Sequence, residues 1–236
     1  PSDPGDSNYT FQSWDKKFDN VTSNLTVTGK YIKSMSISSL TVDKNILYTG
    51  ESCNANVNVD GGSGKFQYDI TVSRKDGSYG GMEYLSSENL SGNYTQKISN
   101  SGDMRAADYI VKVKVTDNYT NLSTSKTIDN LKFVDKLAIN SFTTNVSSAK
   151  NLQTIKLTAD ANGGVSPYTY RFGYILNGVK TYINSSYQTS NTINTTFSKE
   201  GTYKLFVTIK DKNDKTETKY IDNYTVSGTM TALSVN

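Results

Sequence analysis

The sequence predicts an all-β protein made of two tandem β-sandwich domains that follow a short N-terminal β segment. Three observations predict this fold: an internal repeat, an alternation of apolar and polar residues, and turn dipeptides at equivalent places in both copies. No comparable stretch has the i, i+3, i+4, i+7 spacing of an amphipathic helix. Helices are therefore not expected.

The repeat appears when the sequence is shifted by about a hundred residues. Residues 35–72 then lie over residues 137–174 without a gap. The register resumes where YIVKVKVTD (109–117) lies over YKLFVTIKD (203–211). Few residues are identical, but the apolar positions and the turn residues agree, so two copies of one module are the economical explanation.

The two copies set the expected domain boundaries. Residues 34–134 and 135–228 are each expected to form one sandwich, and domains of this length can bury an adequate core. The last residues, 229–236, repeat the pattern of the stretch ISSLTVD in the first copy and are expected to open a truncated third repeat. Residues 1–33 are expected to be a linker followed by a partial β-hairpin.

Within each copy, apolar residues recur at every second position, which is typical of strands with one buried face. The dipeptides Asp76-Gly77 and Asn177-Gly178 lie between such runs, and we expect both to form type I′ hairpin turns. Pairs of glycines at 61–62 and 163–164 mark a second repeated turn. Several short strands with such turns indicate a sandwich of immunoglobulin type.

The single cysteine, Cys53, falls opposite Ile155 in the repeat. A position that accepts isoleucine is a core position, so Cys53 is expected to be a buried apolar residue. A catalytic thiol is the less favoured alternative, because no histidine is present to activate it. One cysteine forms no internal disulfide, which fits an exported protein whose domains are not stapled by disulfides.

The second copy carries a family resemblance. Its stretches GGVSPYTYRF and GTYKLFVTIKD resemble the tandem triple-tyrosine-motif, immunoglobulin-like modules of Gram-positive, clostridial-type surface proteins, through Tyr168, Tyr170, Tyr203 and Asp211. In the first copy AADYIVKVKVTD replaces the Gly-Thr-Tyr opening, and about eight extra residues precede it. The resemblance covers about 34–228 and implies architecture rather than function, because such modules are joined to many different proteins.

The N-terminal stretch YTFQSWDKKFDNVTSNLTVTGKY (9–31) resembles the second half of an internalin B-repeat-like (Listeria-Bacteroides) surface repeat. The family's opening strand is absent, so the resemblance implies an incomplete unit. The match runs through Tyr9, Phe11, Trp14, Asp15, Val21, Thr22, Leu25, Val27 and Tyr31.

The sequence argues against catalysis. There is no histidine, which excludes Ser-His-Asp and Cys-His mechanisms and histidine-ligated zinc, and no phosphate-binding glycine motif is present. The glutamates do not recur between the copies, so no carboxylate pair stands out. We therefore expect no enzyme activity and no cofactor. A net charge of +3 is too weak to indicate nucleic acid or a membrane surface, and no apolar run is long enough to insert in a membrane.

Two aspartates raise the question of a metal. Asp117 and Asp211 recur at the end of the same strand, and Asp211 is followed by Asn213 and Asp214. Calcium requires six to eight oxygens, whereas an aspartate at a strand end more often forms an Asx turn. We expect the Asx turn and no metal site, with weak calcium binding near Asp211 as the alternative.

The tyrosines fall into two groups. Those that recur between the copies are expected to pack in the core with tethered hydroxyls: Tyr68, Tyr109, Tyr170 and Tyr203. Those that do not recur are the candidates for ligand contacts in loops: Tyr79, Tyr84, Tyr182 and Tyr187.

Taken together, the sequence predicts non-catalytic spacer, adhesion or recognition modules of an exported bacterial multidomain surface protein. The location is expected to be extracellular or on the cell surface, and the partner a protein or a glycan there. The alternative is an accessory, wall- or carbohydrate-binding region of a secreted cell-wall or polysaccharide hydrolase whose catalytic domain lies outside these residues.

Overall fold

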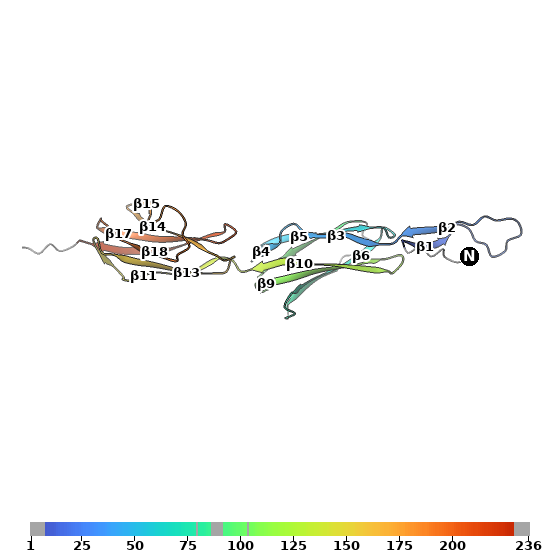
Figure 1. Cartoon of the computed structure of the whole chain (residues 1–236), viewed down its shortest axis with the longest axis horizontal. Coiled ribbons are helices and arrows are strands. Elements are labelled where there is room, and N and C mark those ends of the chain that lie inside the picture. The colour runs from blue at the N-terminus through green and yellow to red at the C-terminus, as the bar shows by residue number, and fades with distance from the viewer. Residues whose placement is uncertain (1–7, 79, 86–91, 103, 229–236) are drawn as a thin grey trace, which may run out of the picture. The chain divides into compact units, whose positions relative to one another are not determined.

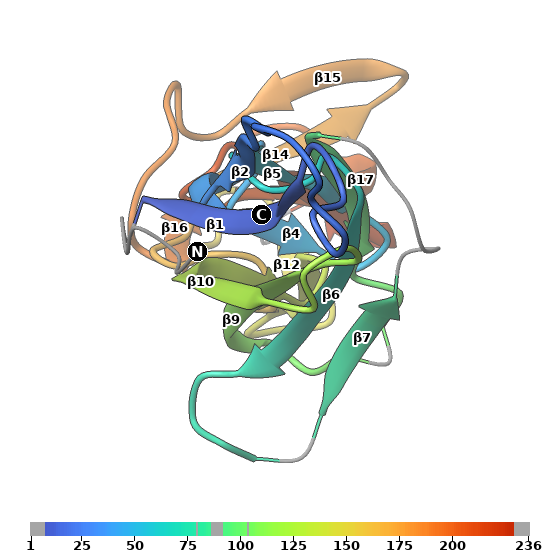
Figure 2. The ribbon, with the colours of Figure 1, turned by 90° about the vertical axis from the view of Figure 1, so that its right-hand side faces the viewer.

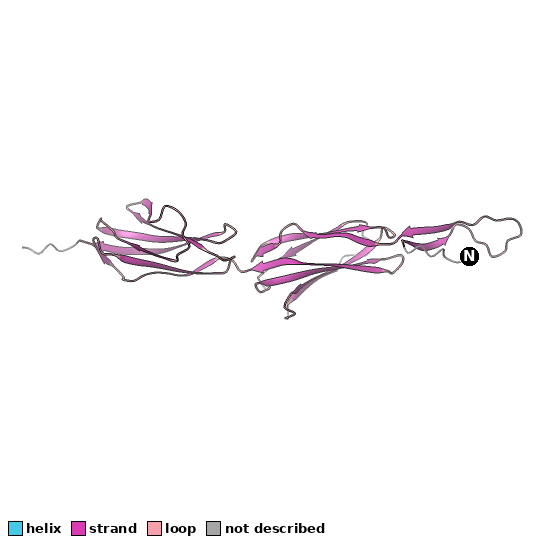
Figure 3. Cartoon of the chain, viewed as in Figure 1, coloured by secondary structure: helices cyan, strands magenta, loops and turns pink. Residues whose placement is uncertain are grey.

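The computed structural model describes residues 8–78, 80–85, 92–102 and 104–228. Every regular element in this part is a β-strand, and none of its residues is helical (Figure 3). The chain divides into two compact units between Phe133 and Val134. The all-β prediction is confirmed, whereas the predicted opening of a third repeat at 229–236 lies outside the described residues.

The first unit begins with a two-stranded antiparallel hairpin, β1 (Tyr9–Trp14) and β2 (Gly29–Lys33). Its aromatic residues pack on one another. The ring centroid of Phe11 lies 5.0 Å from that of Trp14 and 5.5 Å from that of Tyr31. These ring contacts stabilise a hairpin that has no second sheet of its own to pack against among the described residues.

The rest of the first unit is a β-sandwich, hereafter the first domain (Figure 1). Its described strands are β3 (Ser36–Val42), β4 (Ile46–Tyr48), β5 (Ser52–Asp60), β6 (Phe66–Arg74), β7 (Gly81–Leu85), β8 (Tyr94–Ser99), β9 (Ala107–Asp117) and β10 (Ser123–Val134). One sheet has the order β4–β10–β9–β6–β7, and the other has the order β3–β5–β8.

The second unit is a sandwich with the same strand order, hereafter the second domain. Its described strands are β11 (Ala138–Thr144), β12 (Ala149–Lys150), β13 (Ile155–Asn162), β14 (Thr169–Leu176), β15 (Val179–Tyr182), β16 (Thr192–Thr195), β17 (Gly201–Lys210) and β18 (Thr216–Ser227). The sheets are β12–β18–β17–β14–β15 and β11–β13–β16. Figure 2 shows the edge strands, β7 beside β6 and β15 beside β14.

This strand order is that of an immunoglobulin-like sandwich. The N-terminal edge strand of the second domain is divided between the two sheets. Its first part, β11, pairs with β13, and its second part, β12, runs parallel to β18. The remaining pairs of that sheet, β18 with β17, β17 with β14 and β14 with β15, are antiparallel. Two tandem immunoglobulin-like domains are thus present, as the sequence predicted.

The inward-facing residues of the two sheets form each core. Cys53 and Ile155 lie near the start of the equivalent strands β5 and β13 and are 3% and 0% exposed, so their predicted burial is confirmed. Along β9 and β17 every second residue is fully buried, as the period of two predicted: Val111, Val113, Val115, Leu205, Val207 and Ile209.

A tyrosine near the start of β9 and of β17 fastens each sandwich. The hydroxyl of Tyr109 donates to the carbonyl oxygen of Arg105 at 2.9 Å, and that of Tyr203 donates to Lys199 at 2.7 Å. Both rings are at most 2% exposed. The contact, four residues back along the chain, is the tyrosine corner of immunoglobulin-like domains, so the predicted tethering is confirmed for this pair.

A buried aspartate and a Gly-Gly turn form a second recurring device, which we call the aspartate clasp. In the second domain Oδ1 of Asp211 accepts the N–H groups of Asn213 and Lys215, both at 2.9 Å. Its Oδ2 accepts the N–H of Val165, at 3.0 Å, while the N–H of Gly164 donates to the carbonyl of Asp135. The clasp therefore joins the β17–β18 turn, the Gly-Gly turn and the segment that leads into the domain.

The first domain repeats the clasp. Oδ1 of Asp117 accepts the N–H groups of Tyr119 and Thr120, at 2.9 and 3.1 Å, and its Oδ2 accepts that of Ser63 at 2.6 Å. The N–H of Gly62 donates to the carbonyl of Lys33. Gly62 and its counterpart in the second domain have positive φ, where glycine is favoured. A Cβ on Gly62 would lie 2.8 Å from Oδ2 of Asp117, so the close approach also requires glycine.

The predicted type I′ turn is right at one hairpin and wrong at the other. Asn177 and Gly178 have φ of 49° and 79° and connect paired strands directly, as that turn requires. At Asp76-Gly77 only the glycine has positive φ. The carboxylate of Asp76 accepts the N–H of Ser78 at 3.0 Å in an Asx turn, and the connection between β6 and β7 is longer.

We expect the clasp to make Gly164 far less replaceable than Gly178. Both have positive φ, so alanine at either position costs about 1–2 kcal/mol of left-handed strain. A Cβ at Gly164 would also lie 2.9 Å from Oδ2 of Asp211, whereas a Cβ at Gly178 meets nothing within 4 Å. Urea unfolding should show a clearly larger loss for Gly164→Ala than for Gly178→Ala. Equal losses would contradict the steric requirement of the clasp.

Candidate binding surface

The tyrosines predicted as ligand contacts occupy different environments. Tyr79 lies outside the described residues. Tyr84 is in strand β7 rather than in a loop, which corrects the sequence expectation. It stands opposite Ile70 and packs against the core, with its hydroxyl 3.0 Å from Sδ of Met82. Tyr84 thus serves packing on the inner side of its sheet.

Tyr182 and Tyr187 belong to the second domain. Tyr182 is the last residue of β15, so it too lies on a strand, and it stands opposite Gly173. Tyr187 lies in the loop after β15, as expected, and the Nζ atom of Lys210 is 5.1 Å from its ring centroid. A role of either tyrosine in ligand contact stays a prediction.

Tyr182 is one end of a row of aromatic side chains on the outer face of the five-stranded sheet. The cross-strand register places Tyr182 opposite Gly173, Gly173 opposite Phe206, and Phe206 opposite Tyr220. The ring centroid of Phe206 lies 5.5 Å from that of Tyr182 and 6.2 Å from that of Tyr220. We call these three rings the aromatic row.

The absence of a side chain at Gly173 lets the ring of Phe206 pack directly on the backbone of β14. A Cβ at this position would lie 2.3 Å from the ring of Phe206, so that ring occupies the space of the missing side chain. Phe206 is consequently 0% exposed although it points away from the core of the domain. Tyr182 and Tyr220 flank it and remain 40% and 43% exposed, so two rings stay available to a partner.

Cations surround the aromatic row. The guanidinium carbon of Arg171 lies 3.6 Å from the ring centroid of Tyr182, and the Nζ atom of Lys180 lies 4.7 Å from that of Phe206. The Nζ atom of Lys204 is 4.4 Å from the ring centroid of Tyr220 and 3.0 Å from Asp222. These distances are those of cation–π contacts, which hold the charged groups against the rings.

The described residues of the first domain form no such row. Its equivalent cross-strand positions are Glu83 opposite Thr71, Thr71 opposite Lys112, and Lys112 opposite Thr127. Asp69 stands where the second domain has Arg171, since each lies two residues before the row on its strand. The same fold thus forms with polar residues at these positions, so the aromatic row is not required by the architecture.

Sequence reasoning missed Phe206 and Tyr220. The alternation predicted Leu205, Val207 and Ile209 as core residues and assigned no role to Phe206 or Tyr220. The detectable signal was the alternation itself, which places Phe206 at an outward position where the first copy has Lys112. Large aromatic residues at outward positions of one repeat alone are candidates for contact.

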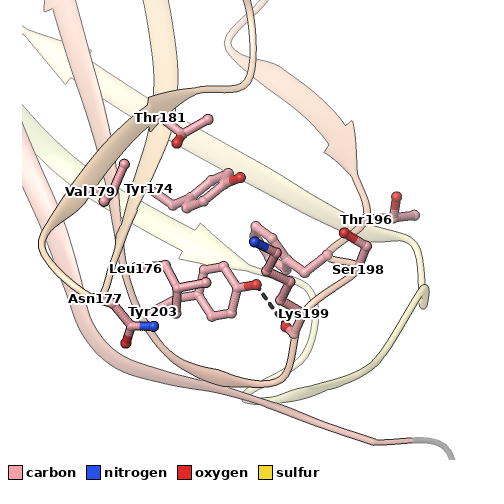
Figure 4. A pocket seen from close by; sticks show the side chains of 10 residues that line it. Tyr174, Leu176, Asn177, Val179, Thr181, Thr196, Ser198, Lys199 and Tyr203 are labelled. Atoms are coloured by element: carbon pink, nitrogen blue, oxygen red, sulfur yellow. Dashed lines mark hydrogen bonds between the residues drawn. The ribbon is translucent and has the colours of Figure 1, made fainter.

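A pocket of about 290 Å³ opens on the other side of the β14–β15 hairpin (Figure 4). Its lining includes the rings of Tyr174, Phe197 and Tyr203 and the side chains of Thr181 and Lys199. Phe197 and Tyr203 are at most 3% exposed, and Tyr203 is the tyrosine of the corner. The pocket is therefore mainly the open end of the hydrophobic core.

Other chemical groups are accounted for by structure. Burial raises the pKa of the Cys53 thiol to about 11, which keeps it protonated and unreactive at neutral pH. Among the described residues, no group of three or more Cys, Asp or Glu side chains is placed to hold a metal ion. The oxygens of Asp211 accept three N–H groups, which supports the predicted Asx turn.

The comparisons with known proteins give structural likeness only. No protein-family model matches the sequence, and no curated protein does. The solved structures that resemble it include the fibronectin(III)-like modules of Clostridium thermocellum CbhA, at 16% identity and a TM-score of 0.32, covering 80% of this chain and 95% of that one. At such values the likeness says nothing about function.

Two further solved structures illustrate the same point. A tetra-tandem repeat from the extending region of a large adhesion protein is 11% identical, with a TM-score of 0.37, and covers 84% of this chain and 52% of that one. The I67–I69 fragment from the I-band of titin is 12% identical, with a TM-score of 0.48, and covers 97% of this chain and 84% of that one.

None of the described residues belongs to a helix that could span a membrane.

We expect Asp117 to make the first domain sensitive to acid. Burial by itself raises the pKa of this carboxyl group, but the N–H donors of Ser63, Thr120 and Tyr119 more than offset it and bring the pKa below its ordinary value. The ionised group therefore stabilises the fold above its unfolded pKa, near 4, and this contribution is lost as the pH falls through the folded pKa. Asp117→Asn should lower the free energy of unfolding by about 1–3 kcal/mol at pH 7, and the loss should become smaller as the pH falls toward 3.

Urea unfolding at the two pH values is the measurement. The exposed carboxylate of Asp108 offers a control, because its ion pair with Lys132 is 4.0 Å long and open to solvent. Asp108→Asn should change little at either pH. An equal effect of Asp117→Asn at pH 7 and pH 3 would show that its charge is not what the clasp uses.

Calcium is expected to have no effect on stability, because the clasp already fills the acceptor positions of Asp211 with N–H donors. The melting temperature should be the same with millimolar calcium as with a chelator. A rise in melting temperature that Asp211→Ala abolishes would instead establish a calcium site.

Proposed function

We propose that these residues are a non-catalytic recognition segment of an exported bacterial multidomain surface protein, and that the outer face of the second domain contacts the ligand. The observation that carries the proposal is the aromatic row with its cations, present in one domain and replaced by Glu83, Thr71, Lys112 and Thr127 in its sister. The partner is a protein or a glycan at the cell surface, and neither nucleic acid nor membrane insertion is involved.

The energetics of the row favour recognition. Exposed tyrosines present a large ring, a polar hydroxyl and few rotatable bonds, so a partner gains contact area at a small cost in conformational entropy. The row also lies on regular strands of one sheet, which hold the rings in register without a ligand. The first domain then acts as a spacer that carries the same framework without the contact surface.

The bacterial surface location rests on two resemblances in sequence. The triple-tyrosine pattern through Tyr168, Tyr170 and Tyr203 points to modules of Gram-positive surface proteins, and the stretch 9–31 points to a B-repeat-like unit. The buried, unpaired Cys53 is compatible with an extracellular domain that does not depend on disulfides.

The same surface would serve an accessory region of a secreted cell-wall or polysaccharide hydrolase. An aromatic surface on a rigid sandwich could hold the polymer while a catalytic domain elsewhere in the protein acts on it. The gene product in full decides between the two functions: a wall anchor or adhesion array favours the first, and an amidase or glycosidase domain favours the second.

Binding to isolated bacterial cell walls and to a glycan array tests the proposal. The double variant Tyr182→Ala, Tyr220→Ala should weaken binding by at least tenfold, because each lost ring contact is worth about 1–3 kcal/mol at a contact site. The matched control is Tyr119→Ala in the first domain, which removes a tyrosine outside the row that is even more exposed, at 56%.

Binding that survives the double variant but is lost in the Tyr119 control would move the site to the first domain and contradict the proposal. Thermal unfolding of each variant confirms that the fold is retained.

A further inference from the structure

Charge distinguishes the outer face of the second domain as clearly as its rings do. Four cations lie along it, and two of them are neutralised: Lys204 pairs with Asp222 at 3.0 Å and Lys210 with Asp214 at 2.9 Å. Among the described residues no carboxylate pairs with Arg171 or Lys180. The face therefore has two uncompensated positive charges, and both lie beside the aromatic row.

The guanidinium of Arg171 is fixed rather than free. It lies 3.6 Å from the ring centroid of Tyr182, and its Nη2 donates to the carbonyl of Ser185 at 3.0 Å. These contacts hold the guanidinium in place before any ligand arrives. A guanidinium fixed in this way suits a carboxylate, whose oxygens accept hydrogen bonds from its N–H groups.

Lys180 lies on the same side of the row. Its Nζ atom is 5.1 Å from the ring centroid of Tyr182 and 4.7 Å from that of Phe206, so Tyr182 has a cation from each of two strands beside it. In the first domain the position of Tyr182 is taken by Glu83 and that of Arg171 by Asp69. The reversal of charge between sister domains shows that the positive charge, like the rings, is not required by the fold.

We infer that the aromatic row binds an acidic polysaccharide whose sugar rings carry carboxylate groups. In such a uronate unit the apolar C–H face of the ring and the anion belong to one monomer. The guanidinium of Arg171 lies directly beside the exposed ring of Tyr182, so one sugar unit can contact the ring with its C–H face and the guanidinium with its carboxylate. The inference rests on the proposed function and adds the chemical class of the ligand.

The length of the row fits a polymer rather than a single sugar. Tyr182 on β15 and Tyr220 on β18 are separated by three strand spacings, about 14 Å, and Lys204 lies beside Tyr220. A chain that crosses the strands would meet an exposed tyrosine at each end of the row, and the two uncompensated cations at the Tyr182 end. Several weak contacts along a polymer add up, so useful affinity does not require a deep cavity.

The test compares polygalacturonate with the same polymer after methyl esterification, which removes the charge and keeps the sugar ring. Biolayer interferometry of the 236-residue chain should show at least tenfold weaker binding to the esterified polymer. Arg171→Gln and Tyr182→Ala should each weaken binding to polygalacturonate by at least fivefold, and Lys180→Gln should reduce its dependence on salt.

Controls separate this surface from general polyanion binding. Lys112→Gln removes an exposed cation at the equivalent of Phe206 in the first domain and should leave binding unchanged. Inorganic polyphosphate of matched charge should bind more weakly than polygalacturonate. Melting temperatures show whether each variant is folded.

Three outcomes would overturn the inference: equal binding to the esterified polymer, binding that Arg171→Gln and Tyr182→Ala leave intact, and preference for polyphosphate. If the chain nevertheless binds cell walls or another partner through Tyr182 and Tyr220, the proposed function stands and only the ligand class is wrong. If it binds neither walls nor any glycan or protein through this face, both fail.

Discussion

The buried carboxylates of Asp117 and Asp211 hold together the parts of each domain that no sheet connects. Each accepts three backbone N–H groups, two from its own turn and one from the Gly-Gly turn. Hydrogen bonds to an ionised acceptor are stronger than those between neutral groups, and a buried carboxylate without them would be very unfavourable. The aspartate, the two glycines and the leading segment therefore depend on one another, which explains why they recur together.

Other recurring contacts complete this framework and leave the outer face of the larger sheet unconstrained. Lys126 and Lys219 each donate to two carbonyl oxygens at the bulge of the first strand, in β3 and in β11. The tyrosine corners tether the start of β9 and of β17 to the segments that precede them. Because these contacts stabilise each domain, the outer face of the larger sheet can differ between the two. The first domain has acidic and polar residues there, and the second domain has aromatic rings and cations.

The sequence predicted the framework better than the surface. The period of two gave the strands and the burial of Cys53 and Ile155, because strand alternation and core composition are local properties. The type I′ turn predicted at Asp76 was wrong, because the carboxylate of Asp76 accepts the N–H of Ser78 and forms an Asx turn instead. The aromatic row was missed because Tyr182, Phe206 and Tyr220 come from three strands, and only the register brings them together.

A transplant within the chain separates framework from surface most directly. The second domain would receive the first domain's residues at the three ring positions, Tyr182→Glu, Phe206→Lys and Tyr220→Thr. Urea unfolding, with cell-wall binding measured on the same sample, is the measurement. The domain should still unfold cooperatively, since its clasp and tyrosine corner are untouched, and binding should be lost. Loss of the cooperative transition would show that the row belongs to the framework, and full binding by a folded variant would show that the ligand is held elsewhere.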